Sequence, residues 1–191
     1  YLQVKSHWEY RDDFKKLSNK TIKVNLALNK FQLRFQGDND LNYLNYNQYT
    51  SKHEYLGPKL DGVVFLHDFS DSPYVFRNMI FYDFYEWTLF LIGIVRKNNL
   101  NIGFKPHPNQ VSSSKKITQK LINQFDDILW IDQNISNRSI FHSGINFGTS
   151  VYGTVLTELA FHNITPISCG DNPASEYSFC LQAKNKSHYR D

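Results

Sequence analysis

Polar side chains that could bind a phosphate or act on a hydroxyl group gather in three short clusters of this sequence. The clusters are His67 to Asp71, Lys105 to Asn109 and Gly148 to Thr154. In the first, His67, Asp68 and Asp71 are predicted as catalytic groups, because an imidazole and two carboxylates can exchange protons with a substrate hydroxyl or coordinate a cation. A plainer interpretation is also open, in which the two aspartates only form the turn before Ser72-Pro73.

The second and third clusters are predicted to bind phosphate. Lys105 and His107 are cation-capable hydrogen-bond donors, and a proline on each side of His107 fixes the local backbone. Gly148 to Thr154 leads from a strand into a helix, where unpaired N–H groups and the helix dipole form a ready phosphate site. The residues predicted to bind the ligand there are Thr149, Ser150, Gly153 and Thr154. The same residues could instead make only a tight turn and a helix cap.

Glu158 lies one helical turn beyond Thr154 and is predicted to accept hydrogen bonds from the hydroxyl groups of a ribose. It could equally be a surface residue of its helix. A single histidine after a strand, such as His107, is likewise common as a capping residue. The functional interpretation therefore depends on whether the fold brings the clusters together.

Strands and helices alternate along the part of the chain that carries the clusters, from Asp61 to Gly170. Strands are expected at Gly62 to Leu66, Leu100 to Phe104, Ile128 to Ile131, Ile145 to Phe147 and Ile164 to Ile167, with a turn at Gly148-Thr149-Ser150. Helices are expected at about Arg77 to Asn98, Ser113 to Phe125, Ser136 to His142 and Gly153 to Asn163. This alternation predicts an α/β fold, a Rossmann-like parallel sheet with helices on both faces. Since each cluster follows a strand, all three are expected along one rim of the sheet.

Residues 1–60 are less regular than the rest and are predicted as a poorly defined, partly helical segment. Helical spacing is visible near Asp12 to Leu17 and Thr21 to Phe35, whereas Leu41 to Tyr55 is expected to be irregular. This segment is interpreted as a remnant or linker from a preceding domain, and residues 61–191 as the Rossmann-like domain. Because the first residue is Tyr1 rather than a methionine, the chain is expected to be a piece of a longer protein.

The composition of the 191 residues narrows the class of protein. The basic residues are scattered and the net charge is only +3, so no nucleic-acid partner is expected. Two cysteines, Cys169 and Cys180, are too few for a disulfide scaffold and lack the spacing of metal ligands, which favours a reducing cytosol. The most apolar run, Leu89 to Val95, is too short to span a membrane. A cytoplasmic location is expected, with peripheral contact to the inner face of the membrane left open.

The order of these clusters resembles the C-terminal, donor-binding half of GT-B glycosyltransferases. The nearest subset is the bacterial capsule and surface-polysaccharide biosynthesis proteins, which include Kdo and sialic-acid transferases. The residues that carry the resemblance are Lys105-Pro106-His107-Pro108, Gly148-Thr149-Ser150, Tyr152-Gly153-Thr154 and Glu158. The stretch Leu66 to Pro73 with the aromatic residues Phe81 to Trp87 is also similar, and the resemblance covers about Leu33 to Pro173.

The resemblance implies a site and a reaction. In those families a His-Pro motif contacts the phosphate of a CMP-sugar and a hydroxyl-rich turn completes the nucleotide site. His107 would then be the phosphate ligand, Thr149 and Ser150 the turn residues, and Glu158 the ribose ligand. The reaction implied is transfer of a sugar from a nucleotide donor, a CMP-sugar being favoured, to a glycan acceptor in a growing surface polysaccharide. No metal or other cofactor is required, because basic groups and a helix N-terminus would stabilise the departing phosphate.

Other functions remain open at this point. A GT-B enzyme needs an N-terminal domain for its acceptor, which 191 residues cannot also hold, so the chain is expected to be an isolated donor half that can be inactive alone. UDP-sugar 2-epimerases and CDP-glycerol-type polymer transferases share the fold and related motifs. A non-catalytic module that binds a nucleotide or a glycan is the alternative outside the enzymes.

Overall fold

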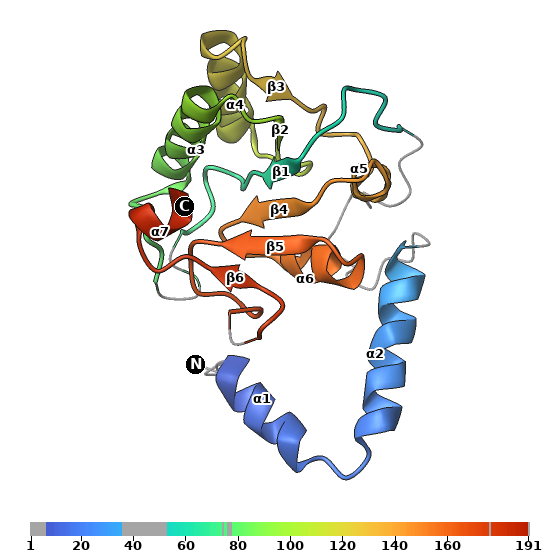
Figure 1. Ribbon diagram of the computed structural model, residues 1–191. Coiled ribbons are helices and arrows are strands. Elements are labelled where there is room, and N and C mark those ends of the chain that lie inside the picture. The colour runs from blue at the N-terminus through green and yellow to red at the C-terminus, as the bar shows by residue number, and fades with distance from the viewer. Residues whose placement is uncertain (1–6, 36–52, 74, 76–77, 176, 191) are drawn as a thin grey trace.

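A computed structural model describes residues 7–35, 53–73, 75, 78–175 and 177–190, and its centre is a six-stranded parallel sheet (Figure 1). The strands are β1 (Gly62–Phe65), β2 (Ile102–Lys105), β3 (Leu129–Trp130), β4 (Phe147–Ser150), β5 (Thr165–Ser168) and β6 (Leu181–Gln182). They lie in the order β3-β2-β1-β4-β5-β6, and every neighbouring pair is parallel. The predicted α/β class, a Rossmann-like parallel sheet with helices on both faces, is confirmed.

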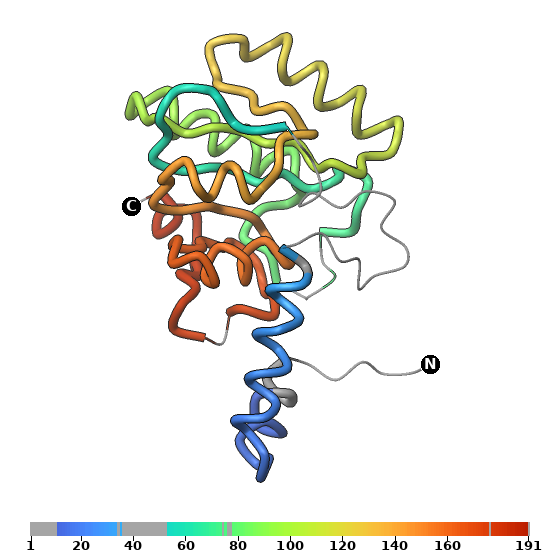
Figure 2. Tube along the Cα trace, turned by 90° about the vertical axis from the view of Figure 1, so that its right-hand side faces the viewer, coloured from blue at the N-terminus to red at the C-terminus, as the bar shows by residue number. Residues whose placement is uncertain are grey.

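Helices cover the sheet on both faces, as Figures 1 and 2 show. The helices are α1 (His7–Lys16), α2 (Lys20–Phe35), α3 (Phe84–Asn98), α4 (Ser112–Gln124), α5 (Asn137–His142), α6 (Thr154–Phe161) and α7 (Lys186–Arg190). One apolar layer joins the sheet to α3 and contains Trp87 and Phe104, both fully buried. The other joins the sheet to α5 and α6 and contains Phe141 and Leu159.

The alternation of side chains along the strands decides which face each residue serves. Val64 of β1 is in register with Phe104 of β2, and both side chains belong to the layer beneath α3. The next pair in register is Phe65 and Lys105, and Phe65 packs in the layer beneath α5 and α6. Lys105 is therefore on the α5 and α6 side of the sheet, beneath an otherwise apolar surface.

Helix α3 begins at Phe84, several residues later than predicted. Asp83 adopts an extended conformation and its carboxylate accepts a hydrogen bond from the backbone N–H of Glu86 at 2.7 Å, which defines an N-cap. The backbone just before the cap bonds elsewhere, because Met79 forms a bridge with Gly170. The predicted start at Arg77 lies outside the described residues, but the described residues 78–83 are not helical, because this tertiary contact competes with the helix and helical spacing cannot reveal it.

The predicted turn at Gly148-Thr149-Ser150 was also wrong, since these residues form most of strand β4. A Cβ atom on Gly148 would lie 2.6 Å from a methyl group of Leu159, so glycine allows α6 to pack closely on the strand. The turn lies one step later and ends at Gly153, whose φ of 120° is in the region that favours glycine. As strand neighbours, Thr149 and Ser150 direct their side chains to opposite faces of the sheet.

The two ends of the chain form elements outside the predicted strand and helix alternation of Asp61 to Gly170. Strand β6 and helix α7 lie beyond the last predicted element, whereas α1 and α2 match the helical spacing noted near Asp12 to Leu17 and Thr21 to Phe35. Most of the stretch predicted to be irregular, Leu41 to Tyr55, lies outside the described residues, which resume at residue 53. No helix in the described part of the chain is both long and apolar enough to cross a bilayer.

A chain of hydrogen bonds fixes α7 against the sheet. The indole N–H of Trp87 in α3 donates to the Tyr189 hydroxyl in α7 at 2.9 Å. Tyr189 is hydrogen-bonded in turn to the Thr149 hydroxyl in β4, which donates to the carbonyl of Ile167 in β5 at 3.0 Å. Because Thr149 uses its hydrogen on Ile167, the Tyr189 hydroxyl donates to Thr149, and every member of the chain is satisfied.

We expect Tyr189→Phe to lower the free energy of unfolding by about 1–3 kcal/mol, because it leaves the fully buried indole N–H of Trp87 without its acceptor. Urea denaturation measures the change. Tyr177→Phe is the control, since Tyr177 is 41% exposed and its hydroxyl is not needed for the core. Equal losses in the two variants would contradict a specific role for the chain of hydrogen bonds.

Candidate functional site

The predicted site residues lie around the point where the strand order changes direction. The chain passes from β1 to β2 and β3 on one side of the sheet, and continues with β4 on the other side of β1. In open α/β sheets such a switch point leaves a crevice beyond the carboxyl ends of the strands, where ligands bind. We call the edge formed by the carboxyl ends of β1, β2 and β4 the carboxyl rim.

His67 follows β1 and sits at the centre of the carboxyl rim. Its Nε2 atom accepts a hydrogen bond from the backbone N–H of Tyr152 at 3.3 Å and lies 3.1 Å from the hydroxyl oxygen of Ser150. Its ring stacks on Phe84 with centroids 4.4 Å apart, and the Tyr152 ring packs on it at the same separation. His67 thereby joins the loop after β1 to the turn after β4.

Burial, and to a smaller extent the neighbouring His107, lowers the pKa of His67 to about 3. The ring is therefore neutral at physiological pH. Because Nε2 accepts a hydrogen bond, the proton of the neutral ring is on Nδ1. At neutral pH this histidine can accept and donate hydrogen bonds, but it carries no charge. It therefore cannot act as a cationic acid in the catalytic role predicted for it.

The carboxylate of Asp68 is occupied by the loop that leads into α4. Its oxygens accept hydrogen bonds from the backbone N–H groups of Ser70 and Val111, at 2.8 Å and 2.7 Å, and from the hydroxyl of Ser114. Burial alone raises the pKa of Asp68, but the hydrogen bonds from these three residues and the proximity of His107 hold it below its ordinary value. Asp68 is thus ionised and buried, and it ties the first cluster to the start of α4.

Asp71 is exposed and His107 half-buried on the carboxyl rim. Desolvation and the charge of Asp68 raise the pKa of Asp71, whose side chain is exposed. Burial lowers the pKa of His107, and the carboxylates of Asp71 and Asp68 oppose that effect. The Nδ1 atom of His107 accepts a hydrogen bond from the N–H of Asn109 at 3.3 Å. Its neutral ring therefore carries the proton on Nε2, where it can donate to a ligand.

Lys105 and Glu158 form a buried charged layer beneath the carboxyl rim. Each side chain is only 2% exposed, on the face of the sheet that α5 and α6 cover. Burial lowers the pKa of Lys105 to about 8, while the carboxylates of Glu158 and Asp132 act in the opposite direction. The lysine remains mostly protonated at neutral pH, so its positive charge lies behind the rim rather than on its surface.

The third cluster divides into a buried and an open part. Thr149 belongs to the hydrogen-bond chain beneath α3 and α7, and Ser150 lies under His67. Gly153 is the N-cap of α6 and supplies no side-chain hydrogen bond to it, and Thr154, the first residue of the helix, is exposed. Thr154, the first residue of α6, is thus the exposed member of this cluster, beside the carboxyl rim.

Tyr152 has a central position that the sequence did not lead us to assign. Its hydroxyl donates to the carbonyl of Ser72 at 2.7 Å, so it bridges the loops after β1 and β4 across the switch point. Burial, together with the charge of Asp71, raises its pKa to about 12. The signal in the sequence was its place between Ser150 and Gly153, but an aromatic residue in a turn does not by itself indicate which loop it contacts.

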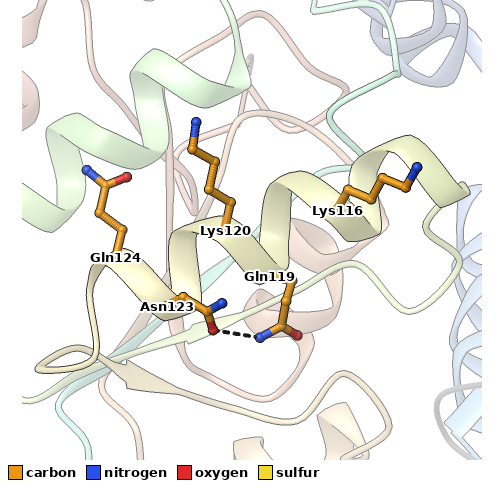
Figure 3. A pocket seen from close by; sticks show the side chains of 5 residues that line it. All are labelled: Lys116, Gln119, Lys120, Asn123 and Gln124. Carbon is orange, nitrogen blue, oxygen red and sulfur yellow. Dashed lines mark hydrogen bonds between the residues drawn. The ribbon is translucent and has the colours of Figure 1, made fainter.

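A groove of about 440 Å³ opens beside the second cluster, between α4 and the loop after β3. Its walls include Pro106, Lys115, Trp130, Asp132, Gln133 and Asn134. A second hollow is lined by α4 alone, through Lys116, Gln119, Lys120, Asn123 and Gln124 (Figure 3). The first groove adjoins the predicted site residues, whereas the second contains none of them. Among the described residues, no group of three His, Cys, Asp or Glu side chains is arranged to hold a metal ion.

Asp68→Asn should lower the free energy of unfolding at neutral pH by about 1–3 kcal/mol, because an amide cannot accept all the hydrogen bonds that the carboxylate accepts. Folding lowers the pKa of Asp68, so its contribution is present above the ordinary value of 3.8 and is lost as pH falls through the folded value. Urea denaturation at neutral and acidic pH measures both effects. Asp126→Asn, at an exposed position, is the control; a similar loss there would contradict the assignment.

His67 is expected to remain neutral, with its proton on Nδ1, when the solution is acidified to about pH 5. Two-dimensional NMR of the imidazole nitrogens distinguishes the two neutral tautomers and the charged ring, and His67→Gln assigns the signal. A titration near the ordinary histidine pKa of 6.5, or a proton on Nε2, would refute the arrangement at the switch point.

Comparison with known proteins gives one distant structural similarity. The chain is similar to a UDP-GlcNAc 2-epimerase of Methanocaldococcus jannaschii, whose crystal structure is a complex with UDP-GlcNAc and UDP, at 13% sequence identity and a TM-score of 0.47. The match covers 96% of this chain and 43% of that protein, so the chain spans less than half of its length. No protein-family model and no curated protein sequence matches the chain.

Proposed function

We propose that this domain binds a nucleotide-activated sugar at the carboxyl rim, with a CMP-sugar as the favoured donor. The observation that carries the proposal is the placement of His107 after β2 and of the N-terminus of α6 after β4, on either side of β1 at the switch point of a Rossmann-like sheet. Both supply hydrogen-bond donors to the same edge, and phosphate is the ligand that such donors bind best.

Phosphate binding is proposed to use three layers of the site. The Nε2–H of His107 donates directly to a phosphate oxygen, and the first-turn N–H groups of α6 beside Gly153 donate from the other side. Lys105 acts from behind as a buried positive charge, screened little by solvent because it is 2% exposed. In this proposal Thr149, Ser150 and Glu158 support the rim from beneath and do not contact the ligand themselves.

The nucleoside is proposed to occupy the groove beside Pro106. Its volume of about 440 Å³ is within the range of small-molecule sites, and it offers the Trp130 ring together with the amides of Gln133 and Asn134. Aromatic and amide groups are the usual partners of a base, which needs one flat apolar surface and a few directed hydrogen bonds. The activated sugar then lies toward the switch point, near Asp71.

Among the three predicted catalytic residues, Asp71 is the one we propose to face the sugar. Its carboxylate is exposed and its pKa is raised, which suits a group that exchanges a proton. His67 and Asp68 are proposed as positioning residues, because one is held neutral and the other is saturated with hydrogen bonds. Transfer of the sugar to a glycan acceptor is proposed for the full-length protein, with acceptor contacts supplied by another domain.

A non-catalytic nucleotide-binding module is the second candidate function. The observation that favours it is the state of the first cluster, where two of the three predicted catalytic groups are committed to holding loops in place. A GT-B-fold epimerase that binds a UDP-sugar is the enzymatic alternative. Affinity for different nucleotides and turnover of UDP-sugars separate these candidates.

Isothermal titration calorimetry with CMP, CDP and UDP tests the proposal, and CMP is expected to bind most tightly. His107→Ala should weaken that binding roughly tenfold or more, since it removes a hydrogen bond to a charged group. His188→Ala is a matched control, because the Nδ1 atom of His188 also accepts a backbone N–H at 3.3 Å but lies on α7. Absence of nucleotide binding, or equal affinities in the two variants, would contradict the site, and tighter binding of UDP would favour the epimerase.

A further inference from the structure

Helix α2 projects away from the sheet domain, and only its C-terminal end packs against that domain (Figures 1 and 2). The ring of Phe31 stacks on Phe161 of α6 with centroids 5.4 Å apart, and Phe35 contacts Phe161 and His162 at 5.1 Å and 4.7 Å. Toward its N-terminus, the side chains of residues 20–30 are all exposed. The packed end fixes the direction of the helix, and the rest of it extends into solvent.

The exposed part of α2 carries an apolar stripe that faces away from the domain. At about 100° per residue, Val24 and Leu28 lie on the same side as the anchoring Phe31. Ile22, Leu26 and Leu33 lie together roughly 160° from that side, and we call them the outer stripe. The three outer-stripe side chains are 48% to 59% exposed, so none of them is covered by the domain.

The positive charge of the chain is concentrated on the same helix. Helix α2 has four basic residues and no acidic one, while the whole chain nets only +3, so the rest of the chain carries a net charge of −1. Lys23 and Lys30 lie within roughly 80° of the centre of the outer stripe, along one of its borders. In helix α1, Asp12 pairs with Arg11 and Lys15 of the same helix.

We propose that α2 is an interfacial helix that binds the surface of an anionic lipid membrane through the outer stripe. A stripe of exposed branched aliphatic side chains bordered by lysines, on a helix without acidic residues, has the apolar and electrostatic components of such binding. An acidic lipid surface matches both components at once, since lysine stems can lie along the apolar side chains while their ammonium groups reach the headgroups. The site on the carboxyl rim is not involved, so the proposal does not depend on nucleotide binding.

Sedimentation of the intact chain with lipid vesicles tests this proposal. Vesicles of phosphatidylcholine alone are compared with an equal mixture of phosphatidylcholine and phosphatidylglycerol, and binding is expected only to the mixture and to weaken as salt is added. Leu26→Asp should reduce the bound fraction about tenfold, because it places a charge within the outer stripe. Ala27→Asp is the matched control, since it introduces the same charge at an exposed position roughly 120° from the centre of the outer stripe and should change binding less than about twofold.

Circular dichroism and urea denaturation establish that both variants are folded, as expected for exposed positions. A pair of substitutions, Lys23→Gln with Lys30→Gln, should lower the salt dependence without removing the apolar contact. Equal binding to neutral and anionic vesicles, or equal losses in Leu26→Asp and Ala27→Asp, would overturn the proposal. A concentration-dependent dimer that Leu26→Asp dissolves would also overturn it, and would assign the outer stripe to a second copy of this chain.

Discussion

The carboxyl rim depends on one buried and neutral imidazole. His67 accepts the N–H of Tyr152 while its ring lies between Phe84 and Tyr152, so a single side chain joins the loop after β1, the turn after β4 and helix α3. Desolvation makes the charged form of this ring costly, which keeps Nε2 available as an acceptor. At the switch point, His67 and the hydrogen bond from the Tyr152 hydroxyl to Ser72 both link the loops after β1 and β4.

Depth separates supporting residues from those that can meet a ligand. The buried charged groups Asp68, Lys105 and Glu158 interact with neighbouring parts of the fold, and their charges act on the rim through a medium with little water. His107, which is half-buried, and the N-terminus of α6, which begins at the exposed Thr154, lie nearer to solvent. The sequence alone predicts these polar residues as a single site. In the fold, the buried ones support the rim from beneath, and only the outer ones can bind a ligand.

Charge is divided between two parts of the molecule. In the sheet domain, acidic and basic groups lie close together, and Asp71 and His107 each affect the pKa of the other. A site with both kinds of group selects its ligand by geometry. Helix α2 carries unbalanced positive charge beside exposed aliphatic side chains, which suits a broad surface rather than a small molecule. Scattered lysines in the sequence become a border on one helix only because helical geometry aligns residues three and seven positions apart.

The sequence by itself determined the α/β class and the order of the elements, because buried parallel strands and amphipathic helices have distinct spacing of apolar residues. It also identified the residues that follow the strands, since polar side chains after apolar runs are locally visible. Tertiary structure alone decided that Gly148 to Ser150 form a strand, that Thr149 bonds to Tyr189, and that Tyr152 spans the switch point. Those outcomes depend on contacts between residues tens of positions apart. Such contacts compete with the local preferences of the chain, and the spacing of residues in the sequence does not encode which of the two prevails.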